Sequence, residues 1–184
     1  MTKHEKMSPG LGGRVVLILM GVVGSGKTTV GNLLAQKLDW QFADADDFHP
    51  AENIRKISHG IALTDADRAP WLAALRRAIE KWNAQGQNVV LACSALKHSY
   101  RQELGAGAVQ FVYLKGEAQL ISQRLHARHG HFASDAILKS QFDDLEEPAD
   151  AVVVSIAQAP DAVAAEIIDK LKLAPVAYPD AARK

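Results

Sequence analysis

Short apolar runs alternate with amphipathic segments along most of the chain. The first run, residues 15–20, is apolar at every position, which is typical of a central strand of a parallel sheet that is buried on both faces. After Lys27, apolar residues recur at helical spacing. This alternation predicts an α/β fold of three layers, in which helices cover both faces of a five-stranded parallel sheet. The predicted strands are 15–20, 40–44, 89–93, 109–114 and 152–156.

The helical segments follow the strands in a regular order. Asp67 is a plausible N-cap for the third of them, because it leaves Pro70 in the first turn, where a missing N–H costs little. The 184 residues are expected to form one domain, and residues 1–13 and 174–184 lack periodicity and should be loose tails. The predicted helices are 27–38, 51–58, 67–86, 117–127, 134–145 and 161–171.

Charge and cysteine content narrow the functional classes. The 21 basic and 21 acidic residues cancel, so no global basic field is available to hold nucleic acid or an anionic membrane. The longest apolar stretch, residues 15–23, is far short of the ~18 residues that a membrane span needs. The single cysteine, Cys93, forms no intrachain disulfide, which makes the cytoplasm the default location. A polyanionic ligand would therefore have to be bound by a local device.

The sequence GVVGSGKT at residues 21–28 supplies such a device. It matches G-x-x-x-x-G-K-[ST], follows an apolar strand and opens an amphipathic helix, which is the context that a phosphate-binding loop requires. Backbone N–H groups of the loop would bind phosphate oxygens, while Lys27 reaches the β- and γ-phosphates and the Thr28 hydroxyl ligates Mg²⁺. The predicted nucleotide-binding residues are Gly21, Gly24, Ser25, Gly26, Lys27, Thr28 and Thr29.

Acidic residues gather where the second strand ends. If the segment is extended, Asp44 and Asp46 point the same way, so that one holds Mg²⁺ through water and the other accepts a hydroxyl proton. An acidic turn that caps the next helix is the alternative interpretation.

Basic residues are spaced in pairs further along the chain. Lys97 and Arg101 are four apart, and on one helix face they would bind an anionic substrate group; solvated surface cations remain an equally open interpretation. Arg124 and Arg128 are also four apart and precede Gly130. This pattern suits a lid, at residues 124–133, that closes over transferring phosphates and neutralises developing charge.

The order of these motifs resembles the gluconokinase family, a bacterial-type group of P-loop kinases related to the nucleoside-monophosphate kinases. The resemblance extends over most of the chain between its two tails. DRxPWL and CSALKxxYR are more specific to that family than the phosphate loop is. The matching segments are GVVGSGKTTVG (21–31), DADDFHP (44–50), LTDADRAPWL (63–72), CSALKHSYR (93–101) and RLHARHGHF (124–132).

The resemblance implies that the chain transfers the γ-phosphoryl group of ATP to the 6-hydroxyl of D-gluconate, with Mg²⁺, as a homodimer. It implies that Asp44 contacts the metal through water together with Thr28, that Asp46 is the base or hydroxyl orienter, and that Lys27, Arg124 and Arg128 stabilise the transferring phosphoryl group. The implied gluconate contacts are Asp46, His49, Lys56, Arg68, Lys97 and Arg101.

Two other functions remain open at this point. A related P-loop kinase could act on another small hydroxy acid, such as shikimate, which also needs cations for its carboxylate. A non-catalytic module that changes shape when it binds ATP is the second alternative, although such a module would not need Asp46 or paired lid arginines.

Overall fold

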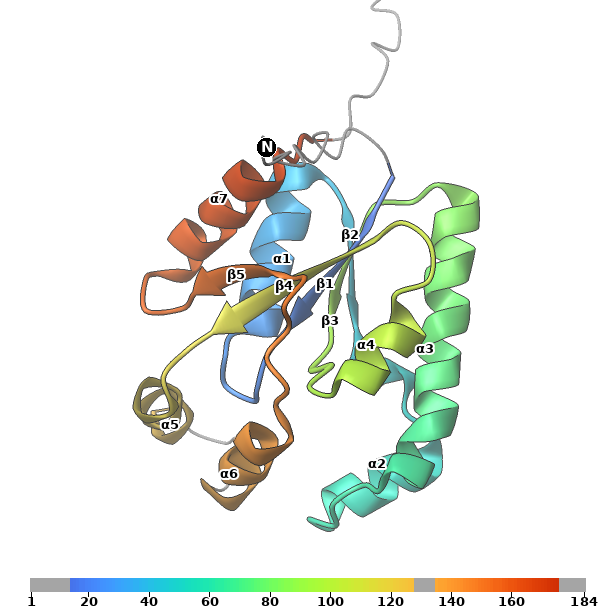
Figure 1. Ribbon diagram of the computed structural model, residues 1–184, viewed down its shortest axis with the longest axis vertical. Coiled ribbons are helices and arrows are strands. Elements are labelled where there is room, and N and C mark those ends of the chain that lie inside the picture. Colours follow the sequence, from blue (N-terminus) through green and yellow to red (C-terminus); the bar gives the residue numbers. More distant parts are fainter. Residues whose placement is uncertain (1–13, 128–134, 176–184) are drawn as a thin grey trace, which may run out of the picture.

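One sheet of five parallel strands forms the centre of the molecule, in the order β2-β3-β1-β4-β5 (Figure 1). The computed structural model describes residues 14–127 and 135–175. Val16 of β1 pairs with Val89 on one side and Val109 on the other, which places β1 at the centre, as its apolar sequence predicts. The strands are β1 (Val16–Met20), β2 (Gln41–Asp44), β3 (Val89–Ala92), β4 (Val109–Lys115) and β5 (Val152–Ser155).

Helices cover both faces of the sheet, which confirms the three-layer α/β fold. Helices α1 and α7 pack together on one face, and α3 and α4 pack on the other (Figure 1). The helices are α1 (Lys27–Leu38), the 3-10 helix η1 (Ala45–Phe48), α2 (Ala51–Ser58), α3 (Asp65–Gln85), α4 (His98–Leu104), α5 (Ala118–His126), α6 (Asp135–Asp144) and α7 (Pro160–Leu171).

The central strand divides the core into two clusters. Leu17 and Leu19 face α1 and α7, whereas Ile18 and Met20 face α3, and all four side chains are fully buried. Cys93 lies in the second cluster, where burial raises the pKa of its thiol to about 12. The thiol therefore stays protonated and behaves as a small core side chain.

Parallel strands bring all their carboxyl ends to one edge of the sheet, and this edge positions the site. The helices α2, α5 and α6 gather around it, on the far side from the described N-terminal end (Figure 1). Among the described residues, none of the helices combines the length and the apolar character that crossing a bilayer would require. The predicted loose tails fall outside the described residues, apart from Ala174 and Pro175.

The start of α3 differs from the prediction. The helix begins at Asp65, and its N-cap is Thr64, not Asp67. Asp67 occupies the third helical position and forms a capping box: its backbone N–H donates to Thr64 Oγ1 (3.2 Å), and its carboxylate accepts from the Thr64 backbone N–H (3.0 Å). Thr and Asp are both favoured at N-caps, and here the two reciprocal hydrogen bonds place Thr64 at the N-cap and Asp67 three residues into the helix.

Candidate active site

The loop between β1 and α1 has the backbone of a phosphate-binding loop. Gly24 and Gly26 have positive φ values of 79° and 93°, a region that side chains with a Cβ rarely adopt. A Cβ on Gly24 would lie 2.8 Å from Leu125 Cγ of α5, so the loop also packs too closely against α5 for a larger residue. Both the backbone conformation and the close approach of α5 therefore require glycine at position 24.

Lys27 lies against this loop. Its Nζ donates to the carbonyl oxygens of Gly21 (2.9 Å) and Val22 (3.0 Å). Burial lowers the pKa of the Lys27 amine, and the nearby Asp46 and Asp44 carboxylates oppose that shift. The ammonium group is therefore held at the mouth of the loop by weak neutral acceptors, which a phosphate group would readily replace.

Asp44 joins the loop to the end of β2. Its Oδ2 accepts from the Thr28 hydroxyl (3.2 Å), and its Oδ1 accepts from the Asp46 backbone N–H (3.1 Å). The second bond caps η1, so residues 45–48 turn and are not extended, and the predicted extended segment is wrong. The two carboxylates still interact across this turn, since the charge on Asp44 contributes to the raised pKa of Asp46.

The pKa of the Asp46 carboxyl lies above its ordinary value. Partial burial is the largest cause, and the neighbouring Asp44 charge adds to it, while Lys27 and His49 act in the opposite direction. Asp46 lines an open cavity, so its carboxylate faces space that a substrate would fill. A raised pKa makes a carboxylate a better proton acceptor.

This cavity has a volume of about 620 Å³ and is bounded by η1, α2, α3, the loop after β3, and α6. Its polar side includes Asp46, His49, Arg68 and Lys97, four of the residues that the sequence predicts for the substrate. Its mixed lining suits a ligand that carries both charge and hydroxyl groups. Apolar and aromatic side chains complete the lining: Ile57, Ile61, Leu63, Trp71, Leu96, Tyr100 and Ile137.

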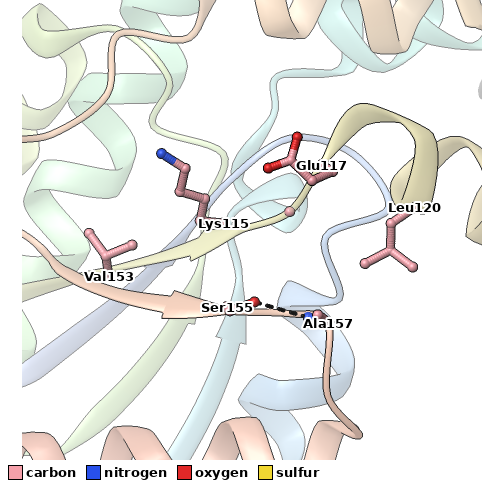
Figure 2. A pocket seen from close by; sticks show the side chains of 7 residues that line it. Lys115, Glu117, Leu120, Val153, Ser155 and Ala157 are labelled. Carbon is pink, nitrogen blue, oxygen red and sulfur yellow. Dashed lines mark hydrogen bonds between the residues drawn. The ribbon is translucent and has the colours of Figure 1, made fainter.

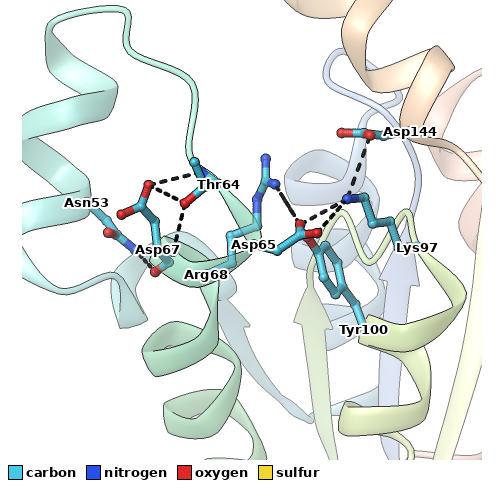
Figure 3. Close-up of polar contacts among 8 residues, drawn as sticks. All are labelled: Asn53, Thr64, Asp65, Asp67, Arg68, Lys97, Tyr100 and Asp144. Carbon is cyan, nitrogen blue, oxygen red and sulfur yellow. Dashed lines mark hydrogen bonds and ion pairs between the residues drawn. The ribbon is translucent and has the colours of Figure 1, made fainter.

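A network around Asp65 holds the cations of the cavity (Figure 3). Lys97 Nζ donates to both Asp65 oxygens (2.9 and 3.1 Å), the Tyr100 hydroxyl donates to Oδ1, and Arg68 lies 3.6 Å from the same oxygen. The hydrogen bonds from Tyr100 and Lys97 lower the pKa of Asp65, while the bond to Asp65 raises the pKa of Lys97. Two cations and a hydroxyl donor are thus gathered at one wall before substrate binds.

Arg101 does not line the cavity. It is 5% exposed, and its guanidinium donates to the carbonyl oxygens of Ala95 (3.0 Å) and Leu96 (2.7 Å). Lys97, the N-cap of α4, lines the cavity, whereas the Arg101 side chain turns to these carbonyls, so the prediction that the two side chains together bind an anionic group is wrong in this structure. Ala95 has a positive φ of 42°, and Arg101 stabilises this strained turn beneath Lys97.

Lys56 also points elsewhere. Its Nζ forms an ion pair with Asp67 Oδ1 (2.7 Å), which links α2 to the start of α3, and it is not among the cavity-lining residues. The hydrogen bond to Lys56 is the largest cause that lowers the pKa of Asp67 to about 2. In this structure Lys56 connects α2 to α3, two of the helices that bound the cavity, and does not itself line it.

Arg124 lies on α5, where its guanidinium donates to the Ile156 carbonyl oxygen (2.7 Å). The helix ends at His126, close to the predicted end at residue 127. Arg128 and most of the predicted lid, residues 128–133, lie outside the described residues. Leu125, the residue next to Arg124, lies close to Gly24 of the phosphate loop, as does Ile121.

A second cavity, of about 230 Å³, lies at the carboxyl ends of β4 and β5 (Figure 2). Leu120 of α5 and Ala157 border it, and the Ser155 hydroxyl accepts from the Ala157 backbone N–H (3.3 Å). The next residue of α5, Ile121, contacts the phosphate loop at Gly24. This cavity is therefore a neighbour of the loop, on the side away from Asp46.

Three further polar residues that the sequence motifs do not single out belong to the site: Asp65, Tyr100 and Asn53. Asp65 and Tyr100 form the hydrogen-bond network that holds Lys97. Asn53 is 3% exposed and contacts His49. The spacing of His49 and Asn53, four residues apart, is a signal that could have linked them.

Comparison with known proteins places these features in a family. The sequence profile of the family described as "Shikimate kinase" matches residues 23–172. Gluconokinase from Gluconobacter oxydans is 43% identical over 173 residues, which cover 91% of this chain and 96% of that protein. Thermoresistant gluconokinase from Escherichia coli is 41% identical over 163 residues, with 85% and 93% covered. The crystal structure of a gluconokinase from Sinorhizobium meliloti has a TM-score of 0.78 at 40% identity, covering 86% of this chain and 92% of that one.

The parallel sheet has the order 2-3-1-4-5, a phosphate loop follows its central strand, and carboxylates lie beside that loop. These features define a P-loop kinase that acts on a small molecule. The named gluconokinases share at least 40% sequence identity with this chain over most of its length, which narrows the class to one family. The chain belongs to the gluconokinase family.

Proposed function

We propose that this protein is a gluconokinase that transfers the γ-phosphoryl group of ATP to the 6-hydroxyl of D-gluconate and so forms 6-phospho-D-gluconate and ADP. One observation carries the assignment of roles: Asp46 lines the same cavity as Lys97 and Arg68, and it lies two residues from Asp44, which accepts a hydrogen bond from Thr28 of the phosphate loop. Gluconate has one carboxylate and a row of hydroxyls, and this cavity offers cations for the first and polar partners for the second.

In the proposed mechanism, the nucleotide phosphates bind the backbone N–H groups of residues 21–28, and Lys27 leaves its carbonyl partners to contact them. Asp46 orients the 6-hydroxyl and accepts its proton. The hydroxyl oxygen forms a bond to the γ-phosphorus as the bond to the β–γ bridging oxygen breaks, and ADP carries away that electron pair. Arg124 and Arg128 are proposed to neutralise charge on the transferring group.

The residues beside the loop fit a magnesium ion. The Thr28 hydroxyl and the Asp44 carboxylate are hard oxygen ligands in contact with one another, and Mg²⁺ is usually held by one or two carboxylates plus substrate phosphates. In the described part of the chain no group of three or more His, Cys, Asp or Glu side chains could form a cage of their own. Thr28 would hold the ion directly and Asp44 through water; when bound, the ion neutralises phosphate charge.

We propose that four of the cavity-lining residues, those that the sequence also predicts, contact the acceptor. Lys97 and Arg68 would bind the gluconate carboxylate, and His49 and Asp46 its hydroxyl groups. Lys56 and Arg101 are proposed to act indirectly, because neither lines the cavity; Lys56 is bound to Asp67, and Arg101 to the loop after β3. The smaller cavity beside α5 is a candidate for the nucleotide base.

A coupled ADP assay with a panel of acceptors tests this function. Gluconate should be turned over, with phosphorus NMR placing the new ester at O6, whereas shikimate and nucleoside monophosphates should not. The Lys27→Ala variant, which loses the loop cation, is the inactive control. If shikimate is phosphorylated and gluconate is not, the protein is a kinase for that hydroxy acid. If ATP binds but no acceptor is phosphorylated, the protein is a non-catalytic ATP-binding module.

Two further features remain predictions: the oligomeric state, which follows from the resemblance, and the location, which follows from cysteine usage. A homodimer is proposed, and light scattering of the purified chain would measure its mass. A cytoplasmic location is proposed because the lone cysteine is buried and protonated and so requires no oxidising compartment.

A further inference from the structure

Asn53 of α2 contacts a histidine that lines the acceptor cavity. Its amide nitrogen, Nδ2, donates to the Asp67 carbonyl oxygen across 2.8 Å and lies 3.4 Å from Nδ1 of His49. An amide nitrogen only donates hydrogen bonds, and the bond to Asp67 fixes which way the amide group faces. Nδ1 of His49 is therefore the acceptor in this contact.

The imidazole ring cannot readily turn to offer its other nitrogen to Asn53. The ring stacks on Trp71, with 4.7 Å between centroids and 11° between planes. Trp71 is itself fixed, because its Nε1 donates to the Ala45 carbonyl oxygen across 2.7 Å. With Nδ1 held by Asn53, Nε2 is the ring nitrogen left for the cavity that His49 lines.

We propose that Asn53 is a positioning residue for phosphoryl transfer: it keeps the proton of neutral His49 on Nε2, so that His49 presents a fixed N–H donor to an oxygen of the acceptor. The identity of that acceptor as a sugar acid rests on the proposed function. A neutral imidazole has one donor and one acceptor nitrogen, so the partner of one nitrogen decides what the other offers.

The surroundings keep His49 neutral, which is why its tautomer matters. Burial is the largest effect and lowers the pKa of His49. The charged groups that face it are Asp46 of η1, which opposes this shift, and Arg68 of α3, which reinforces it. Near pH 7 the ring therefore carries a single proton, and Asn53 determines its place.

The direct test is nitrogen NMR of the full-length protein labelled at histidine, without substrate. The two ring nitrogens differ in chemical shift according to which one bears hydrogen, and the His49→Gln variant identifies the His49 signals. We expect hydrogen on Nε2. Hydrogen on Nδ1 would overturn the proposal, whether or not gluconate is turned over; failure of the proposed function would leave this measurement intact.

A kinetic test uses Asn53→Asp. The new carboxylate should draw the proton to Nδ1, leaving Nε2 without hydrogen until the imidazolium ion forms at lower pH. The kcat/KM for gluconate should therefore fall about tenfold, the effect of one lost hydrogen bond, as pH rises through the His49 pKa, and recover below it. A ratio of variant to wild type that does not change with pH would overturn the proposal.

Asn53→Leu is the matched control. It loses the same bond to the Asp67 carbonyl and frees Nδ1 of His49 without adding a charge that draws the proton there, so its loss of kcat/KM at higher pH should be clearly smaller than that of Asn53→Asp. If Asn53→Leu showed the same pH-dependent loss as Asn53→Asp, the effect would come from packing and the proposal would fail. If neither variant folds, the NMR measurement on the wild-type chain decides.

Discussion

The hydroxyl of Thr28 donates a hydrogen bond to Oδ2 of Asp44 across 3.2 Å, and this contact joins the first turn of α1 to the last residue of β2. Because β3 lies between β2 and β1 in the sheet, the contact spans a gap of one strand. It brings an acidic group from outside the phosphate loop to the position where a loop-bound cation would lie.

Asp44→Asn should therefore raise the Mg²⁺ concentration that activity requires. A residue that acts on a metal through water typically contributes about 10–100-fold to metal affinity or activity. Initial rates measured against magnesium chloride at fixed ATP would show the shift. Asp47→Asn, a neighbouring exposed carboxylate outside the cavity lining, is the control and should follow the wild-type curve. Equal magnesium requirements in all three proteins would remove Asp44 from the metal site.

Asp46→Asn should abolish most turnover and leave ATP binding intact. The amide keeps the shape of the side chain but accepts no proton, and loss of a general base typically lowers kcat by about 10²–10⁴-fold. Single-turnover kinetics and fluorescence titration with a labelled ATP analogue would separate chemistry from binding. A kcat within a few-fold of wild type would show that Asp46 is not the proton acceptor.

Arg101→Ala should destabilise the protein, because Arg101 supports the loop after β3 and does not line the cavity. Hydrogen bonds from a charged group contribute about 1.5–3 kcal/mol, so thermal and urea unfolding should both show a clear loss of stability. Arg77→Ala, at an exposed position of α3, should change the free energy of unfolding by less than about 0.5 kcal/mol. Unchanged stability with a raised KM for gluconate would instead favour the direct contact that the sequence suggests.

Asp67→Asn should reduce stability at neutral pH but not in acid. The pKa of Asp67 is about 2 in the folded protein, below its ordinary value of 3.8, so its carboxylate stabilises the fold above pH 3.8. This contribution is lost as pH falls from about 4 to about 2. Urea unfolding midpoints of wild type and variant should therefore differ at pH 7 and pH 4 and approach each other between pH 3 and pH 2. A difference that stays constant over this range would contradict the role of the Lys56–Asp67 pair.

The fold could be predicted from the sequence because its strands are short and almost wholly apolar. A run such as residues 15–20 has no polar position that would permit another environment, and the structure buries it fully. The phosphate loop was equally clear, since its glycines, lysine and threonine occupy fixed spacings in one continuous segment. The structure confirms the sheet and the position of the loop between β1 and α1.

The acceptor side of the site was less predictable, because it depends on contacts between distant segments. Spacing alone placed Arg101 with Lys97, whereas two backbone carbonyls bury the guanidinium. Spacing also placed Asp44 and Asp46 on an extended chain, whereas the Asp44 side chain caps a turn. In both cases a polar side chain forms hydrogen bonds with nearby backbone groups and not with a ligand, and residue type alone does not reveal which partner it takes.

The strand order has a consequence for how such enzymes diversify. The proposed acceptor residues follow β2 and β3, whereas Arg124 and the smaller cavity follow β4 and β5, with the phosphate loop of β1 between them. Changes in the segments after β2 and β3 can therefore alter these acceptor contacts while the phosphate loop and Arg124 stay the same. One scaffold can thereby give rise to kinases for chemically different acids while it keeps the same phosphate-binding loop.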